Sequence, residues 1–159
     1  MNCEHFGPGS VVWDVQSRDK YEAIRETVDR STVFSAIPNL NLKKFTQAVI
    51  TREREQTTGF GHGIAIAHGR DPVIDESRVA LGVSRNGIEF GSPDGQPVHL
   101  LFVVANHPDK HVDYLRILSS LAIIVRNEFF RREILSALCR EDVERKMGHA
   151  IRGILAKAV

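Results

Sequence analysis

The fold is decided by the stretch TTGFGHGIAIAHGR, residues 57–70. Its first half carries three glycines, which adopt backbone angles that other residues avoid, and this indicates a turn. The run from Ile64 to Ala67 is short, apolar and partly β-branched, which predicts a buried strand. His68 follows at the carboxyl end of this strand, beside Gly69, where open α/β sheets bind ligands. The pattern makes His68 a candidate functional residue; the alternative is a histidine that merely caps a strand in solvent.

The composition is that of an ordinary globular domain. The 159 residues include 42% hydrophobic and 26% charged side chains, enough for one sizeable core. A formal net charge of +1 gives no field that favours nucleic acid or a membrane surface. No apolar run approaches the ~20 residues that span a bilayer, and the first residues lack the apolar core of a signal peptide. Cys3 and Cys139 form no metal-binding spacing and no disulfide framework, so we expect a cytoplasmic protein without membrane insertion.

Turn-forming residues and hydrophobic periodicity divide the chain into elements. The cluster Gly7-Pro8-Gly9-Ser10 predicts a flexible leader over residues 1–10, followed by one domain over residues 11–159. We expect extended segments at 11–15, 64–67, 78–83, 88–90 and 98–105. We expect helices from Ser17 as N-cap to Arg30, from about Asn41 to Glu55, and at about 108–126, 131–138 and 142–157.

Two further signals set the architecture. Asn86-Gly87 is the strongest short hairpin signal and predicts a tight turn between two strands. The run from Val98 to Ala105 is apolar on both faces, as is typical of a central strand covered by helices on each side. We therefore predict an α/β fold: a single domain with a mixed, mostly parallel β-sheet flanked by helices on both faces.

Several segments coincide in order and spacing with those of a known family. They are Arg52-Glu53-Arg54, Thr57-Thr58-Gly59, Gly63 to Gly69, and an aromatic residue followed by Asp-Gly-x-Pro-Val within residues 90–98. Together they resemble the phosphorylation-site region of the enzyme IIA domains of the fructose/mannitol type, in the bacterial phosphoenolpyruvate-dependent sugar phosphotransferase system. The resemblance extends from about Val11 to about Arg152. It departs at Ala67, where the family usually has proline, and at His62, where asparagine or a carboxylate is common.

The resemblance implies a function for these residues. It implies that His68 accepts a phosphoryl group from an HPr-like phosphocarrier protein and passes it to a IIB partner. It also implies catalytic roles for Arg52, as an active-site arginine, and for His111, as the second histidine at the start of the helix over 108–126. Three further residues are expected to bind the transferred group: Thr58, His62 and Gly69. No cofactor and no metal are implied, because the donor is already a phosphohistidine.

Imidazole chemistry adds detail to this expectation. Attack by Nε2 of His68 requires Nδ1 to hold the proton, most simply by donating to a backbone carbonyl in the glycine turn. His62, six residues before His68, is expected near the approach of the phosphate, where it can donate a hydrogen bond to a phosphoryl oxygen. The alternative is that His62 points to solvent and only tolerates the turn.

Two other functions stay open. The first is a regulatory module of the nitrogen-related phosphotransferase branch, in which phosphorylation of His68 controls binding to a partner protein. The 159 residues contain no IIB or IIC sequence, which favours this branch. The second is a catalytic zinc site formed by His62, His68 and His111. The lack of a tight His-x-x-x-His pair counts against zinc.

Overall fold

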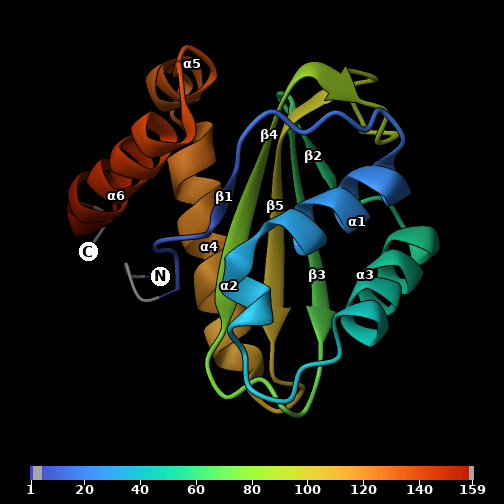
Figure 1. Cartoon of the computed structure of the whole chain (residues 1–159). Coiled ribbons are helices and arrows are strands. Elements are labelled where there is room, and N and C mark those ends of the chain that lie inside the picture. Colours follow the sequence, from blue (N-terminus) through green and yellow to red (C-terminus); the bar gives the residue numbers. More distant parts are fainter. Residues whose placement is uncertain (2–4, 158–159) are drawn as a thin grey trace.

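A five-stranded sheet forms the centre of the computed structural model, which describes residues 1 and 5–157, with side chains up to residue 153 (Figure 1). The strands lie in the order β1-β4-β5-β3-β2. Neighbours are parallel in β1–β4 and β3–β5, and antiparallel in β2–β3 and β4–β5. The bounds are β1 Val11–Val12, β2 Gly59–Gly61, β3 Ile64–Arg70, β4 Arg78–Ile88 and β5 Val98–Asn106. The predicted α/β domain with a mixed sheet is confirmed.

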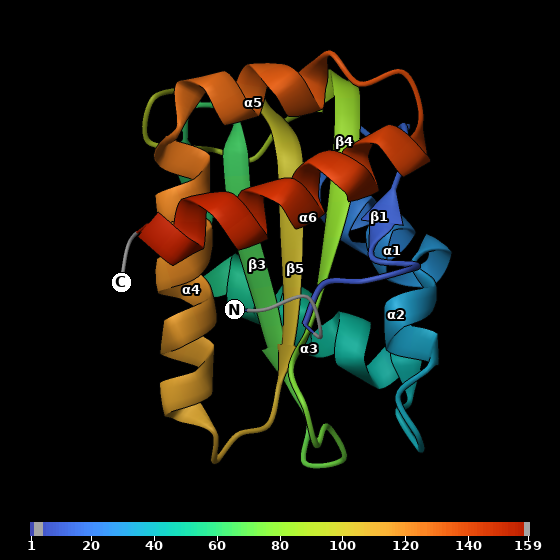
Figure 2. The same cartoon turned by 90° about the vertical axis from the view of Figure 1, so that its left-hand side faces the viewer.

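Helices cover both faces of this sheet, as expected. Figures 1 and 2 show α1, α2 and α3 on one face, and α4, α5 and α6 on the other. The first group consists of α1 Lys20–Arg30, α2 Thr32–Ser35 and α3 Leu42–Glu55. The second group consists of α4 His111–Arg126, α5 Glu128–Leu135 and α6 Arg140–Lys157.

The central strand is β5, and its side chains alternate between two hydrophobic cores. Leu100 and Phe102 belong to the core beneath α4, α5 and α6, whereas Leu101 and Val103 belong to the core beneath α1, α2 and α3. Successive residues of a strand point to opposite faces, so a strand covered on both sides must be apolar at every position. This confirms the prediction made from the apolar run over residues 98–105.

Most helix boundaries lie within a few residues of the predicted ones. Asn41 caps α3 by accepting a hydrogen bond from the N–H of Lys44 at 3.1 Å. The N-cap of α1 is Asp19 rather than Ser17, whose hydroxyl instead donates to Glu26 at 2.8 Å. The helix predicted over 131–138 begins and ends three residues earlier, as α5. The short elements α2 and β2 had no distinct sequence signal.

The expected hairpin turn at Asn86-Gly87 is wrong, because both residues lie inside β4. Val83 pairs with Leu100 and Ile88 pairs with Val98, so the ladder contains a bulge on β4 between these pairs. Gly87 has a φ of 89°. A left-handed glycine serves a bulge as well as a hairpin turn, and local sequence does not distinguish them.

The expectation of a flexible leader is also wrong for residues 5–10. The carbonyls of His5 and Ser10 accept hydrogen bonds from the N–H groups of Val79 and Leu81, each at 2.8 Å. Phe6 is only 4% exposed and belongs to the core under α4. This segment therefore packs along the sheet, because an apolar side chain within it fills part of the core. Residues 2–4 lie outside the described residues.

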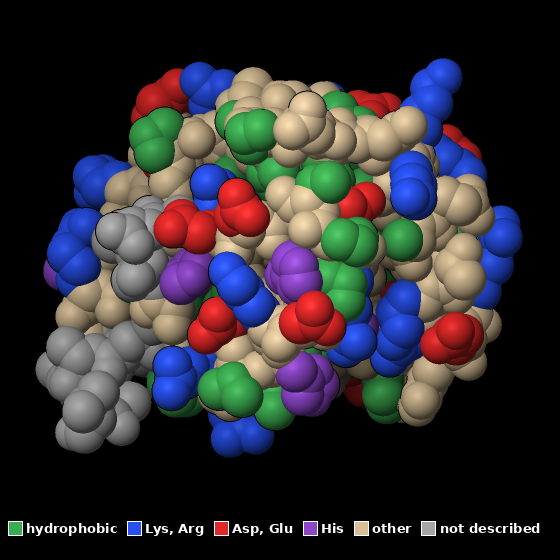
Figure 3. Space-filling model, turned by 90° about the horizontal axis from the view of Figure 1, so that it is seen from below, with side chains coloured by type: hydrophobic (Ala, Val, Ile, Leu, Met, Phe, Trp, Pro, Cys, Tyr) green, Lys and Arg blue, Asp and Glu red, His purple; other side chains and the backbone are tan. Residues whose placement is uncertain are grey.

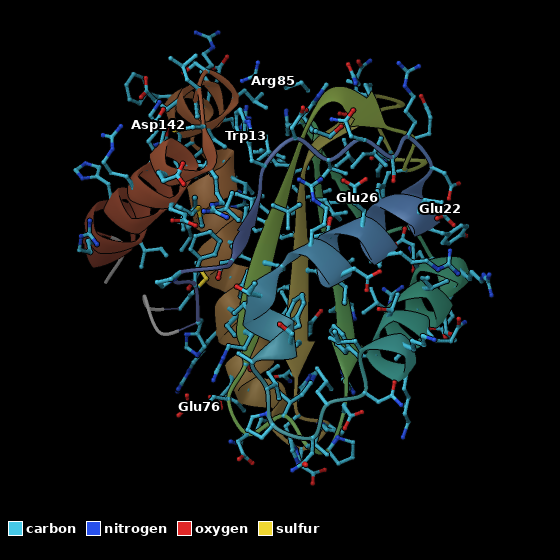
Figure 4. The ribbon with its side chains drawn as sticks, viewed as in Figure 1. Trp13, Glu22, Glu26, Glu76, Arg85 and Asp142 are labelled. Atoms are coloured by element: carbon cyan, nitrogen blue, oxygen red, sulfur yellow. The ribbon has the colours of Figure 1, made fainter. Side chains whose placement is uncertain are left out.

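Arg85 of β4 connects segments at the end of the sheet where β3 and β5 begin. Its guanidinium lies 4.7 Å from the ring centroid of Trp13, as the side chains in Figure 4 illustrate. It also donates to the carbonyl of Ala137, between α5 and α6, at 3.1 Å. A cation over an indole ring is favourable, so Arg85 links three segments far apart in the sequence.

Candidate functional site

His68 lies near the carboxyl end of β3, on the face that carries α4. Ile64 and Ile66, four and two residues earlier, belong to the core beneath α4, so the alternation of the strand places His68 at the edge of that core. The imidazole is partly buried. The end of the molecule where β3 and β5 finish carries lysines, arginines, acidic residues and histidines, as Figure 3 shows from below.

An open cleft of about 480 Å³ exposes one side of His68. It lies between the end of α3, the 57–60 segment, β3 and α4. Its lining includes Arg52, Thr58, Phe60, His68, Tyr114 and Leu115. The cleft therefore joins the quoted 57–70 stretch to two helices that are distant from it in the sequence.

Tyr114 of α4 makes a side-chain contact with the imidazole of His68. Its hydroxyl oxygen lies 3.0 Å from Nδ1 of His68, within hydrogen-bond distance, and the two ring centroids are 4.9 Å apart. A backbone carbonyl had been expected at Nδ1, and the backbone of Ile66 does form a hydrogen bond with the His68 ring, which raises its pKa against the larger effect of burial. A phenol can donate or accept, so it can serve either tautomer of the imidazole.

Sequence reasoning missed Tyr114 because a second apolar stripe on this helix has the same spacing. That stripe consists of Leu115, Leu118, Ala122 and Val125. The buried residues are instead Tyr114, Ile117, Leu121, Ile124 and Val125. Leu115 is 49% exposed and lines the cleft with Leu118 and Ala122. Both stripes have helical spacing, so only packing against the sheet decides between them.

The electrostatics of the site keep His68 neutral. Burial lowers the pKa of His68 from 6.5 to about 4, and the positive charges of Arg52 and Arg70 act in the same direction. Burial also raises the pKa of the Tyr114 hydroxyl. At neutral pH the pair is therefore a neutral imidazole beside a neutral phenol. A neutral imidazole is the form that can act as a nucleophile.

Arg52 is placed at the cleft, as expected from the sequence. It lies in the last turn of α3, and its guanidinium donates to the carbonyl of Gln56 at 2.8 Å. The guanidinium of Arg54 lies elsewhere, 5.4 Å from the ring centroid of Tyr21 on α1. The structure therefore separates the two arginines, and only Arg52 lines the cleft.

Thr58 is held by Glu53, a residue to which the sequence assigned no role of its own. The Thr58 hydroxyl donates to Oε2 of Glu53 at 2.5 Å, and its N–H donates to Oε1 at 3.0 Å. Lys20 of α1 lies 3.2 Å from the same carboxylate, whose side chain is fully buried. Thr58 does line the cleft, but its hydroxyl proton is used by Glu53.

His111 is the first residue of α4 and is exposed. Its ring centroid lies 6.1 Å from that of Tyr114, whose ring in turn is 4.9 Å from that of His68. Tyr114 is thus a neighbour of both histidines. His111 does not line the cleft itself, and the structure places it beside the site.

His62 and Gly69 do not line the cleft. His62 lies in the turn before β3, and its N–H donates to Asp94 at 2.9 Å. From Ile64 to His68 the strand extends by about 13 Å, so the turn lies at the other end of β3. A Cβ on Gly69 would lie 2.7 Å from Val49 of α3, so Gly69 points to the opposite face of the sheet. Both residues depart from the expectation that they bind the transferred group.

The zinc alternative finds no support in this geometry. His62 lies at one end of β3, whereas His68 lies near the other. In the described part of the chain, no three histidine, cysteine, aspartate or glutamate side chains are grouped so that they could hold a metal ion.

Comparison with known families decides the relationship. Residues 4–146 match the model of the family described as phosphoenolpyruvate-dependent sugar phosphotransferase system, EIIA 2. The chain belongs to this EIIA family. The resemblance seen in the sequence, to EIIA domains of the fructose/mannitol type including the nitrogen-regulatory branch, is thereby confirmed.

Relatives of this EIIA protein come from both branches. It is 33% identical over 129 residues to the fructose-specific EIIABC component of Bacillus subtilis, covering 80% of this chain and 20% of the relative. It is 35% identical over 97 residues to the fructose-specific EIIA component of Haloferax volcanii, covering 61% and 63%. The chain therefore spans less than two thirds of either relative. A nitrogen regulatory protein of Bradyrhizobium diazoefficiens is 24% identical over 127 residues, covering 80% and 81%.

Solved structures share the fold of this EIIA protein. The nitrogen regulatory protein IIA-Ntr of Neisseria meningitidis has a TM-score of 0.81 at 24% identity, with 91% of this chain and 97% of the other covered. The IIA mannitol protein of Escherichia coli has a TM-score of 0.72 at 19% identity, with 89% and 98% covered. Among the described helices, none combines the length and apolarity needed to cross a bilayer.

Proposed function

We propose that the protein is a phosphocarrier in sugar uptake, in which His68 accepts a phosphoryl group from an HPr-like protein and passes it to a IIB partner. One observation carries the proposal: a neutral imidazole stands in an open cleft beside an arginine, in a chain that belongs to the EIIA family. A structure of Escherichia coli IIA mannitol was determined in complex with phosphorylated IIB mannitol, and this chain shares its fold with a TM-score of 0.71.

The chemistry needs no nucleotide and no metal. Nε2 of His68 attacks phosphorus and forms a new N–P bond while the N–P bond of the donor phosphohistidine breaks. The electron pair of the broken bond returns to the imidazole of the donor. The transition state spreads negative charge over the equatorial oxygens, so positioning and cationic donors supply most of the catalysis. Arg52 supplies a guanidinium that can bind two phosphoryl oxygens at once.

His111 has a secondary role in this proposal. It stands at the first position of α4, where free N–H groups and the helix dipole favour an anion. An exposed imidazole there can meet a phosphoryl group carried by a partner protein. We expect His111 to affect onward transfer more than loading.

A second function keeps the same phosphorylation but changes its use. Relatives named as nitrogen regulatory proteins include that of Escherichia coli, at 33% identity over 100 residues. In this alternative, phosphorylation of His68 controls the binding of a regulated partner protein, and no phosphoryl group is passed on.

Phosphorylation in vitro tests the shared step. The protein is incubated with phosphoenolpyruvate, enzyme I and HPr, and the phosphate is mapped by mass spectrometry at alkaline pH. We expect acid-labile, alkali-stable phosphate on His68, lost in His68→Ala and retained in His149→Ala, a control on the exposed face of α6. Stoichiometric phosphate on His68→Ala would overturn the assignment.

The two uses of the phosphate are separated by a second measurement. The phosphorylated protein is mixed with purified IIB fructose and IIB mannitol domains. Transfer of the label to IIB supports the transport function. If the label stays on His68 while the phosphorylated and unphosphorylated forms bind different proteins, the regulatory function is supported.

A further inference from the structure

We propose that Tyr114 is a positioning residue, whose hydroxyl oxygen accepts a hydrogen bond from Nδ1–H of His68 and so leaves Nε2 free as the nucleophile. The inference rests on the proposed function and deepens it. Tyr114 does not touch the transferred group in this account. It acts through His68, by fixing the position of the proton on the imidazole ring.

The geometry fixes this contact in place. The two groups are 3.0 Å apart, and their rings lie at a tilt of 47° with centroids 4.9 Å apart. Tyr114 is 8% exposed, and its ring packs in the core beneath α4. A buried tyrosine hydroxyl needs a hydrogen-bond partner, and Nδ1 provides it. The guanidinium of Arg70 lies 5.9 Å from the Tyr114 ring centroid and covers the ring.

The chemistry of the step decides which group donates. When Nε2 forms its bond to phosphorus, the imidazole becomes cationic and Nδ1 still carries its proton. Only an acceptor at Nδ1 can then stabilise the ring, and the oxygen of a phenol is such an acceptor. A donor at Nδ1 would instead require the proton to sit on Nε2, which blocks attack. The bond from Nδ1–H to Tyr114 strengthens during transfer, since hydrogen bonds from charged donors are stronger than neutral ones.

Tyr114 lies between the rings of His68 and His111. The ring of His111 lies next to Tyr114, with centroids 6.1 Å apart. Tyr114 thus occupies the position adjacent to Nδ1, and His111 is left exposed at the start of α4. The roles therefore divide: Tyr114 orients the nucleophile, and His111 stays available to a phosphoryl group outside the cleft.

The test combines Tyr114→Phe with a matched control. Phenylalanine keeps the ring that packs against His68 and removes only the hydroxyl. Tyr21→Phe is the control, because Tyr21 is the other tyrosine of the chain and lies on α1, across the sheet. Loading of His68 from phospho-HPr should slow about tenfold in Tyr114→Phe, the scale of one hydrogen bond to a charged group. It should be unchanged in Tyr21→Phe.

A spectroscopic readout separates positioning from a structural role. The ¹⁵N chemical shifts of the His68 ring are measured by NMR in the unphosphorylated protein at about pH 7.5. We expect the proton on Nδ1 in the wild type, and a smaller Nδ1-protonated fraction in Tyr114→Phe. A wild-type proton on Nε2 would overturn the inference. So would loading that is unchanged or faster in Tyr114→Phe.

The failure of this inference can be told apart from failure of the proposed function. The tautomer of His68 is measured without any phosphoryl donor. The wild-type measurement also does not depend on whether a variant folds. If the wild type takes no phosphate on His68, the proposed function fails, and the ring shifts still decide which atom carries the proton. If the wild type is phosphorylated and Tyr114→Phe matches it, only the role of Tyr114 fails.

Discussion

The carboxylate of Glu53 accepts hydrogen bonds from both the hydroxyl and the N–H of Thr58, at 2.5 and 3.0 Å. Glu53 lies in α3 and Thr58 just before β2, so this pair closes the connection between the helix and the sheet. Lys20 of α1 adds an ion pair at 3.2 Å. Arg52 and Thr58, on either side of Glu53 in this connection, both line the cleft. By holding Thr58, Glu53 therefore positions one wall of the site.

Glu53→Gln should destabilise the protein by about 1–3 kcal/mol, because a fully buried carboxylate that accepts from Thr58 and pairs with the partly buried Lys20 is lost. The new amide also presents N–H groups to donors that need an acceptor. The free energy of unfolding is measured with urea. Glu55→Gln is the matched control, since Glu55 is exposed in the same turn of α3. Equal stabilities of the two variants would show that the pair contributes little.

The pKa of His68 predicts how stability depends on pH. In the folded protein this pKa lies at about 4, against 6.5 in the unfolded chain. Between these values the unfolded chain binds the proton and the folded protein does not, so stability falls as pH decreases from 6.5 to 4. Above pH 6.5 neither state binds this proton, so His68 causes no loss of stability there. His68→Asn removes the titrating group, so its stability should fall less over this pH range.

The same property is measured directly by titrating the His68 ring proton in NMR spectra. We expect a midpoint near 4 and a neutral ring throughout the range in which partner proteins work. A midpoint near 6.5, the ordinary value for histidine, would contradict the burial and the effect of Arg52 and Arg70. In Arg52→Gln the midpoint should rise, because one of the neighbouring positive charges has been removed.

Gly69 gives a prediction about packing rather than binding. A Cβ at this position would lie 2.7 Å from Val49 and 2.9 Å from Phe45, two buried side chains of α3. Gly69→Ala should therefore destabilise the protein by about 1–3 kcal/mol, because α3 must move away from the sheet. His68 should still be phosphorylated in the folded protein. A variant that keeps full stability but loses phosphorylation would restore the binding role expected from the sequence.

Much of the fold could be predicted from the sequence because its signals are local. The alternation of β5 between two cores follows directly from an apolar run, and Asn41 carries its own capping signal for α3. Asn86-Gly87 shows the limit of such reasoning. The left-handed backbone that it favours occurs in a hairpin turn and in a bulge, and the pairing of β4 with β5 decides which forms.

The residues of the site that lie within 52–68 were predicted from the sequence, whereas the contact with the distant helix α4 was not. The resemblance to the EIIA family indicated both His68 and Arg52, and both line the cleft. Tyr114 is separated from His68 by 46 positions, so only the packing of α4 on the sheet brings the two together. His62 is close to His68 in sequence, but the strand from Ile64 to His68 extends by about 13 Å and places the turn that carries His62 at its other end.

Arg52 allows a sharp test of how the cleft stabilises the transferred phosphoryl group. Arg52 lines the cleft. Arg54, two residues later on α3, lies over the ring of Tyr21 instead. Arg52→Ala should slow the loading of His68 by about 10²-fold, the scale of losing one donor to the transition state. Arg54→Ala should leave the rate unchanged.

Arg52→Lys distinguishes charge from geometry at this position. A lysine keeps the positive charge but cannot bind two phosphoryl oxygens with a planar fork, so its rate should fall between those of wild type and Arg52→Ala. Single-turnover loading from phospho-HPr gives all four rates. If Arg52→Lys matches the wild type, Arg52 acts only through its charge. If Arg52→Ala also matches it, then Arg52 takes no part in the transfer, and the phosphoryl group must be stabilised by other donors around His68.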